Sequence, residues 1–291
     1  MKRLIFISTL LLLFACGNNN SANKQVNSQK KQLNISILLD LSDRINPQKY
    51  PVIPEHFQRD VEIVKAVTEH FKTNMENLTA WKAKGKIRAF FSPVPSNPAI
   101  NEIASKLNID CSKIDNKGRK EVYDTLTPLF SQNLTEIYEQ SIIASSWEGS
   151  DVWRFFKDDV QDYCIEKDDN YRNILIILTD GYIYHKQSAY KRNNRYSYLL
   201  SSNIGKYRNG NWQEQIDNVD FGLTCTRNDL QDLEVLVLEV SAENQSNKID
   251  EDILKYSLKK WFKEMNVCKY EVYSSDLPAN TKTRIDRFLN N

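Results

Sequence analysis

Carboxylate and hydroxyl side chains follow two of the most apolar segments of the chain. Asp40 and Ser42 come directly after the run 35–39, and Asp180 comes after the run 174–178. Carboxylate and hydroxyl oxygens are the ligands that hard divalent cations prefer, and Mg²⁺ needs few of them because it keeps several waters. Asp40, Ser42 and Asp180 are therefore candidate ligands for Mg²⁺, or for Mn²⁺ or Ca²⁺.

The segments before these residues read as strands. Runs at 35–39, 174–178 and 235–238 are short and rich in Ile, Leu and Val, as in strands that are buried on both faces of a parallel sheet. Weaker strand patterns occur at 86–91 and 268–273.

Apolar side chains spaced by three and four residues predict helices between the strands. The expected helices span residues 57–78, 134–144, 152–163, 253–265 and 281–289. Strands that alternate with helices predict an α/β fold, with an open, mostly parallel sheet and helices on both faces in a Rossmann-like, three-layer arrangement. Ligands of such sheets bind beyond the carboxyl ends of the strands, where Asp40 and Asp180 are expected.

The order of these residues resembles the von Willebrand factor A domain. In that family an Asp-x-Ser-x-Ser loop, a threonine from a second loop and an aspartate from a third form a metal-ion-dependent adhesion site. The resemblance implies that Asp40 and Ser42 supply the first loop, Thr135, at the expected start of a helix, the second, and Asp180 the third. It implies a binding or adhesion module, not an enzyme, in which an acidic side chain of a protein partner completes the coordination of the cation.

The sequence departs from the family pattern at Arg44, which stands where the family has its second serine. A guanidinium cannot coordinate a cation and repels one nearby unless it pairs with a carboxylate. The Gly-rich lead-in to the threonine is also missing. Plainer roles stay open: Asp40 and Asp180 as turn residues, Thr135 as a helix cap, and Ser150 or Asp151 as the cap of the helix at 152.

A basic, tyrosine-rich insertion is expected at about 182–222. It either packs its tyrosines on the edge of the domain, the reading that we favour, or binds anionic or sugar ligands by charge and stacking. Its Lys186, Arg192 and Arg195, with Arg44, form a possible ligand rim. A second hypothesis is thus a metal-free surface for protein interaction or anion binding, and a third is a Mg²⁺-dependent hydrolase or phosphotransferase with a carboxylate nucleophile.

The N-terminus has the features of an export signal. Two basic residues precede an apolar run at 4–15 that is too short to span a bilayer, and the run ends in Leu-Phe-Ala-Cys-Gly. This resembles the lipobox of bacterial lipoproteins, which implies a signal peptide at 1–15 and a lipid on Cys16. A polar tether at 16–32 would then hold a domain at 33–291 to a membrane of the cell envelope, facing the periplasm or the cell surface.

Composition excludes several other classes. The formal net charge is +1, and it becomes −1 once Lys2 and Arg3 are removed, so no global charge favours nucleic acid. The sequence has no H-E-x-x-H or G-x-S-x-G motif. The four cysteines after Cys16 form no C-x-x-C pair, and the sequence leaves their disulfide pairing open.

Overall fold

The computed structural model describes residues 30–79, 81–145, 147–244 and 246–290. The predicted signal peptide, Cys16 and most of the predicted tether lie outside the described residues. Within these ranges, no helix has the length and apolarity needed to cross a membrane.

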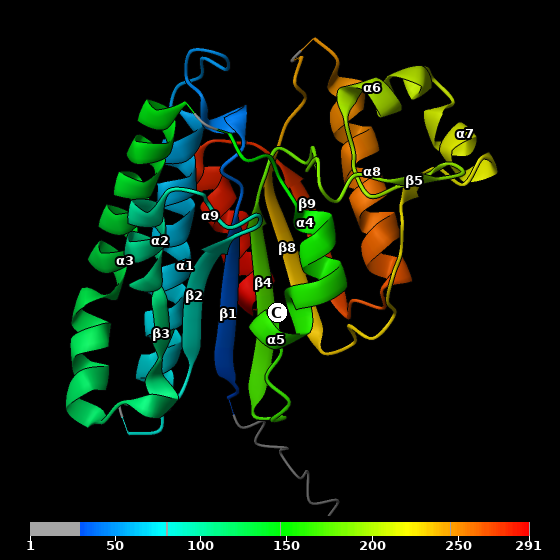
Figure 1. Cartoon of the computed structure of the whole chain (residues 1–291). Helices are drawn as coiled ribbons and strands as arrows, with labels where there is room; N and C mark the ends of the chain where they lie inside the picture. The colour runs from blue at the N-terminus through cyan, green and yellow to red at the C-terminus, as the bar shows by residue number, and fades with distance from the viewer. Residues whose placement is uncertain (1–29, 80, 146, 245, 291) are drawn as a thin grey trace, which may run out of the picture.

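A six-stranded sheet forms the middle layer, with the strand order β3-β2-β1-β4-β8-β9. Its strands are β1 (Gln32–Leu39), β2 (Lys86–Phe91), β3 (Asn108–Asp110), β4 (Tyr171–Leu178), β8 (Leu233–Val240) and β9 (Lys269–Ser274). Only the edge strand β3 runs antiparallel to its neighbour, so the carboxyl ends of the other five strands share one edge, at the top in Figure 1.

Helices cover both faces of this sheet. One layer contains α1 (His56–Leu78), α2 (Pro98–Ser105), α3 (Asn116–Ala144) and α9 (Pro278–Asn290). The other contains α8 (Lys248–Glu264) and the continuous helical stretch of α4 (Val152–Arg154), a π-helical turn (Phe155–Asp159) and α5 (Val160–Cys164). The predicted three-layer α/β fold is confirmed.

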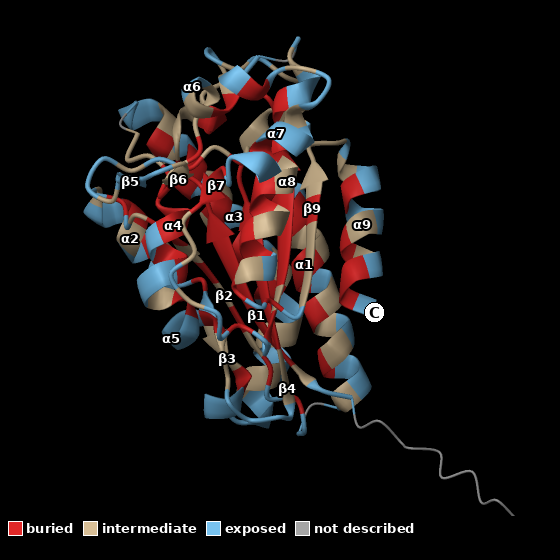
Figure 2. Cartoon of the chain, turned by 90° about the vertical axis from the view of Figure 1, so that its right-hand side faces the viewer, coloured by how far each residue is buried: buried red, intermediate tan, exposed pale blue. Residues whose placement is uncertain are grey.

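The apolar runs are continuous because each strand is buried on both sides. Ile174 and Ile176 of β4 pack in the core toward α1 and α3, whereas Leu175 and Ile177 pack in the core toward α8. Figure 2 shows the buried strands between the two helix layers. Loss of alternation between apolar and polar side chains is the pattern expected of a parallel sheet with both faces covered.

The segment between β4 and β8 carries small elements of its own. It contains β5 (Lys191–Arg192), β6 (Arg195–Tyr196), α6 (Ser201–Ile204), α7 (Trp212–Asn218) and β7 (Gly222–Leu223), and its strands form a separate three-stranded sheet. Tyr196 and Tyr207 are buried there, and both rings contact Phe221. These tyrosines pack as core residues of the insertion.

The predicted helix start at Thr135 is wrong. Helix α3 begins at Asn116, with the Asp115 side chain accepting a hydrogen bond from the Gly118 backbone, and it runs through Pro128 to Ala144. Only the last third of this helix carries the apolar spacing clearly, which is why the sequence pattern indicated a start near residue 134.

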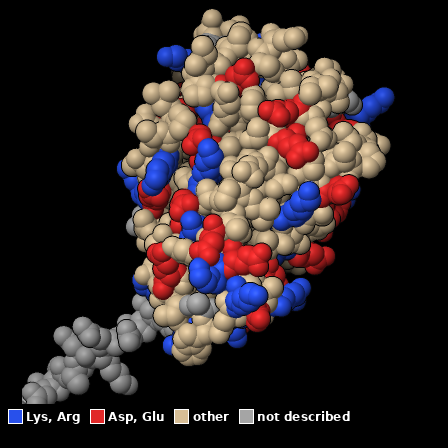
Figure 3. Space-filling model, turned by 90° about the vertical axis from the view of Figure 1, so that its left-hand side faces the viewer, with Lys and Arg blue, Asp and Glu red and all other residues tan. Residues whose placement is uncertain are grey.

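The cysteines of the described part are unpaired, and charges of both signs are mixed on one face of the domain. The four cysteines of the described part, Cys111, Cys164, Cys225 and Cys268, are free thiols. Acidic and basic side chains lie among each other on the face formed by the helices at the left of Figure 1, as Figure 3 shows. That face carries no extended patch of one sign for a nucleic-acid backbone.

Candidate functional site

Strands β1 and β4 bring the predicted carboxylates to the same edge of the sheet. Leu39 and Leu178, the last residues of these strands, are paired in register. The backbone N–H of Asp40 donates to the carbonyl oxygen of Leu178 at 3.1 Å, which ties the loop after β1 to the end of β4. The expectation that Asp40 and Asp180 lie beyond the carboxyl ends of neighbouring strands is therefore met.

Asp40 joins these two loops through both of its carboxylate oxygens. Its Oδ1 accepts from the backbone N–H of Ser42 at 2.8 Å, and its Oδ2 accepts from the hydroxyl of Thr179 at 2.7 Å. The side chain is only 3% exposed. Asp40 thus orients Ser42 and the start of the Asp180 loop, and its oxygens are already engaged.

Arg44 does not lie on an exposed rim, in contrast to the prediction. It is 2% exposed, and its guanidinium donates to the Asp60 carboxylate of α1 and to the backbone oxygens of Asp40 and Leu178. Burial by itself lowers the pKa of Arg44, but nearby acidic groups, led by Asp60, outweigh it and keep the pKa above its ordinary value. The guanidinium is a buried cation that is paired with a carboxylate, as the metal hypothesis required.

A pocket of about 260 Å³ opens where the three loops meet. Ser42, Ser150 and Asp180 all line it, together with Tyr182 and Tyr184 of the insertion. The Ser150 hydroxyl is buried and has no hydrogen-bond partner among the described residues. A buried hydroxyl without a partner loses free energy, so its presence in a pocket suggests a ligand or a water that satisfies it.

The backbone at Gly149 holds Ser150 in this place. Gly149 has a φ of +84°, and a Cβ there would lie 2.5 Å from the carbonyl oxygen of Tyr184. That same oxygen accepts a hydrogen bond of 2.9 Å from the Ser150 backbone N–H. Only glycine allows this close approach, which fixes Ser150 beside the insertion and opposite Ser42.

Ser150, not Thr135, is the hydroxyl that the structure places between the other two loops. Thr135 lies inside α3, donates its hydroxyl to the carbonyl oxygen of Ser131 at 2.9 Å, and does not line the pocket. The sequence predicts Ser150 or Asp151 as the cap of the helix at 152, and the structure assigns the cap to Asp151, whose side chain accepts from the Arg154 backbone. The sequence feature that could have indicated Ser150 is the run Gly-Ser-Asp at 149–151, directly before the helix at 152. Asp151 caps the helix, so the hydroxyl of Ser150 is left for the pocket.

Asp180 is the carboxylate of the site with a free oxygen. Its Oδ1 accepts from the Tyr182 backbone N–H at 3.0 Å, and it has no ion pair among the described residues. Burial, and then the negative charge of Asp40, raise the pKa of Asp180 to about 8. Two carboxylates this close together without a free cation favour the uptake of a proton or of a metal ion.

The basic residues predicted as a rim are not gathered at this pocket. Arg195 pairs with Asp220 at the edge of the insertion and with Glu264 at the end of α8. Lys186 and Arg192 are exposed and do not line the pocket. The rim prediction is corrected for Arg44, which is buried, and for Arg195, which is held in a structural ion pair.

The donor set fits a hard cation only with help from water. The described ranges contain no group of three or more His, Cys, Asp or Glu side chains that could hold a metal ion. Ser42, Ser150 and Asp180 provide two hydroxyls and one carboxylate, and Asp40 lies behind them. Mg²⁺ accepts such a sparse oxygen set because it retains several waters, so these residues fit Mg²⁺ better than a metal that requires nitrogen or sulfur ligands.

No protein-family model matches the sequence, and no curated protein matches it significantly. The solved structures include a similar chain, the pilus adhesin SpaC from Lactobacillus rhamnosus GG. The identity is 10%, the match covers 89% of this chain and 30% of the adhesin chain, and the TM-score is 0.42. The chain thus spans less than a third of the length of that adhesin.

Proposed function

We propose that this protein is a binding module that recognises an acidic side chain of a protein partner through a divalent cation, as in the von Willebrand factor A domain. The cation is held by Ser42, Ser150 and Asp180, with Asp40 orienting the first and third loops. One observation carries this proposal: the three side chains line one pocket, and the Ser150 hydroxyl is buried there without a partner.

Each residue has a separate task in this proposal. The hydroxyls of Ser42 and Ser150 offer neutral oxygens, and Asp180 offers the charge that attracts the cation. Bound Mg²⁺ supplies an open coordination position that a carboxylate of the partner can fill. Because Arg44 replaces a hydroxyl ligand of the family pattern, the site has fewer protein ligands and depends more on water and on the partner.

Arg44 does not oppose a cation as strongly as its charge suggests. Its pairing with Asp60 offsets the positive charge within the core, so the site faces a neutralised ion pair. A fully exposed arginine at this position would repel Mg²⁺ directly.

The second part of the proposal concerns location. We infer from the lipobox-like sequence that Cys16 is lipidated and that the polar segment after it tethers the α/β domain to a membrane of the cell envelope. The tether would leave the carboxyl edge of the sheet free to meet a partner in the periplasm or at the cell surface.

The decisive experiment compares two hydroxyl variants in a calorimetric titration with Mg²⁺ and Mn²⁺. Ser150→Ala is expected to weaken metal binding by at least about 10-fold, because it removes a ligand oxygen. Thr135→Ala is the matched control, and it is expected to bind the metal as the wild type does. Equal binding by Ser150→Ala and the wild type, or no binding by a folded wild type, contradicts the metal site.

Two alternatives remain distinguishable from this function. A metal-free interaction surface predicts partner binding that survives EDTA. A hydrolase or phosphotransferase predicts turnover of a phosphomonoester, but both oxygens of Asp40 already accept hydrogen bonds, which leaves it poorly placed as a nucleophile.

A further inference from the structure

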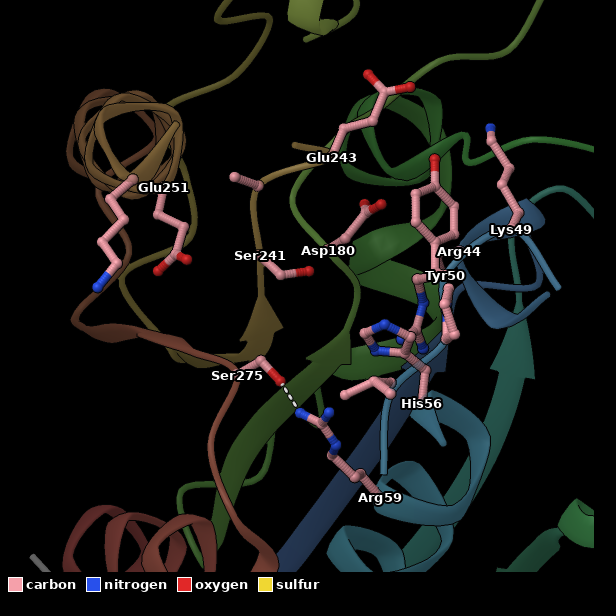
Figure 4. A pocket seen from close by; sticks show the side chains of 14 residues that line it. Arg44, Lys49, Tyr50, His56, Arg59, Asp180, Ser241, Glu243, Glu251 and Ser275 are labelled. Atoms are coloured by element: carbon pink, nitrogen blue, oxygen red, sulfur yellow. Dashed lines mark hydrogen bonds between the residues drawn. The ribbon is translucent and has the colours of Figure 1, made fainter. Parts of the chain in front are cut away.

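A second and larger cavity adjoins the first one at Asp180. Its volume is about 470 Å³, within the range of small-molecule sites. The loop after β1, the start of α1, the ends of β8 and β9 and the first turn of α8 surround it, as Figure 4 shows. The two pockets share Lys49, Tyr50, Asp180 and Glu243. Ser150 lines only the smaller pocket, whereas Arg44, His56 and Glu251 line only the larger one.

Most cations of the cavity are already neutralised by carboxylates. Three ion pairs account for them: Arg44 with Asp60, Lys49 with Asp43, and Arg59 with Glu239. Arg59 also donates to the Ser275 hydroxyl, which in turn donates to Glu239 at 2.8 Å. These cations therefore add little net positive charge to the cavity.

The acidic side chains of the cavity lack such partners. Within the described ranges, no ion pair involves Asp180, Glu243 or Glu251, and Lys248 is the one lining cation without a pair. Because the pKa of Asp180 is raised to about 8, the unpaired charges near neutral pH are the two carboxylates of Glu243 and Glu251 and one ammonium group, and Asp180 adds a third carboxylate at higher pH. This excess of negative charge favours a cationic group of a ligand.

Buried nitrogen atoms at the bottom of the cavity need an oxygen partner. Arg44 Nη1 and His56 Nδ1 are both buried and without a hydrogen bond among the described residues. Arg44 is almost fully buried and lowers the pKa of His56 by its charge, after the larger effect of burial, so the two groups are neighbours, as Figure 4 also shows. A carbonyl or carboxylate oxygen that reaches this place would accept from the guanidinium.

We propose that this cavity binds a primary ammonium group that carries a neighbouring carbonyl or carboxylate oxygen. The negative charges of Glu243 and Glu251 attract the ammonium to the cavity that Asp180 also lines, and the oxygen accepts from Arg44 and His56. Free α-amino acids and the amino ends of peptides share this chemistry, and the cavity is large enough for either. The proposal does not depend on a bound metal ion.

The test is calorimetry in EDTA with four probes: L-alanine, L-alanyl-L-alanine amide, N-acetyl-L-alanyl-L-alanine amide and propionate. Saturable binding of at least one free amine is expected, whereas the acetylated peptide and propionate lack the cation and should not bind. Tighter binding of the peptide amide identifies a peptide amino end as the ligand, and tighter binding of alanine identifies a free amino acid. No saturation by either amine up to about 10 mM, or equal binding of the acetylated peptide, overturns the proposal.

Variants locate the binding and separate it from the metal site. The double variant Glu243→Gln with Glu251→Gln is expected to weaken amine binding by about 10-fold or more, because it removes two unpaired charges. Glu121→Gln, an exposed position on α3, is the matched control. Ser150→Ala should retain amine binding, and Glu251→Gln should retain Mg²⁺ binding. Unchanged amine affinity in the double variant places the ligand elsewhere and overturns the assignment.

Discussion

At the scale of single residues, the carboxyl edge of the sheet contains acidic groups whose charges are costly. Asp180 has no cation beside it except the paired Arg44, and burial together with Asp40 raises the pKa of Asp180 to about 8. Glu239 shows the same effect, because burial and then the charge of Asp60 raise its pKa to about 7. Such destabilising charges are common where a protein binds ligands.

Removing the charge of Asp180 is expected to stabilise the metal-free protein. The folded-state pKa lies above the ordinary value of 3.8, so the folded state binds more protons than the unfolded state between about pH 4 and pH 8, and stability falls as the pH rises through this window. Asp180→Asn removes that loss. After allowance for partial exposure, the gain in the free energy of unfolding at pH 8 should be about 1–3 kcal/mol.

Urea unfolding of Asp180→Asn and the wild type at pH 5 and pH 8.5, both in EDTA, measures this gain. The difference between the two proteins should be larger at the higher pH, and the variant should bind no Mg²⁺. A variant that is less stable than the wild type at both pH values shows that the carboxylate is structural, against this prediction.

At the scale of elements, the insertion between β4 and β8 is tied to both ends of α8. Arg208 pairs with Asp250 in the first turn of α8 at 2.7 Å, and Arg195 pairs with Glu264 at the last residue at 2.7 Å. Asp250 is fully buried, and Arg208 is the cation that pairs with it. Arg195 and Arg208 of the insertion thus connect it to α8 by ion pairs and are not part of a free cationic surface.

Arg208→Ala is expected to loosen the insertion from α8. The variant leaves the buried Asp250 carboxylate without its cation, which costs about 1–3 kcal/mol because Arg208 is partly exposed. Chymotrypsin should then cleave the tyrosine-rich segment 182–222 faster than in the wild type. Arg192→Ala, which removes an exposed charge in the same segment, is the control, and equal cleavage rates in the two variants would argue against this connection.

At the scale of the whole molecule, the proposed site lies at one edge of the sheet and the first described residues at the other. Strand β1 begins at Gln32 near the end of the sheet opposite the site, at the bottom of Figure 1. A lipid anchor before this strand would therefore attach to the domain at the end opposite the proposed site. This arrangement suits a module that contacts a partner in the surrounding space.

The anchor itself is tested by Cys16→Ser. We expect this variant to lose incorporation of labelled fatty acid, because the proposed acyl acceptor is the Cys16 thiol. It should also shift from the membrane fraction to the soluble fraction, since acyl chains supply the membrane affinity. Cys268→Ser, at an exposed thiol of the domain, is the control. Fatty-acid labelling that persists in Cys16→Ser would contradict lipidation at this residue.

The sequence by itself determined the layers of the fold and two of the three loops of the site. Strands buried on both faces leave continuous apolar runs, and amphipathic helices leave a spacing of three and four residues, so both are local patterns. The positions of Asp40 and Asp180 follow from these patterns, because parallel strands place their carboxyl ends at one edge.

Only the tertiary structure decided which hydroxyl lies in the pocket beside Ser42 and Asp180, and where the cations lie. Ser150 reaches the pocket because Gly149 permits a close approach to Tyr184, a residue far along the chain. Arg44 is buried because Asp60 of α1 pairs with it across the layer. Such contacts join residues that are distant in sequence and leave no periodic pattern. The family resemblance therefore indicated Thr135, and the rim hypothesis an exposed Arg44, whereas packing placed Ser150 in the pocket and Arg44 in the core.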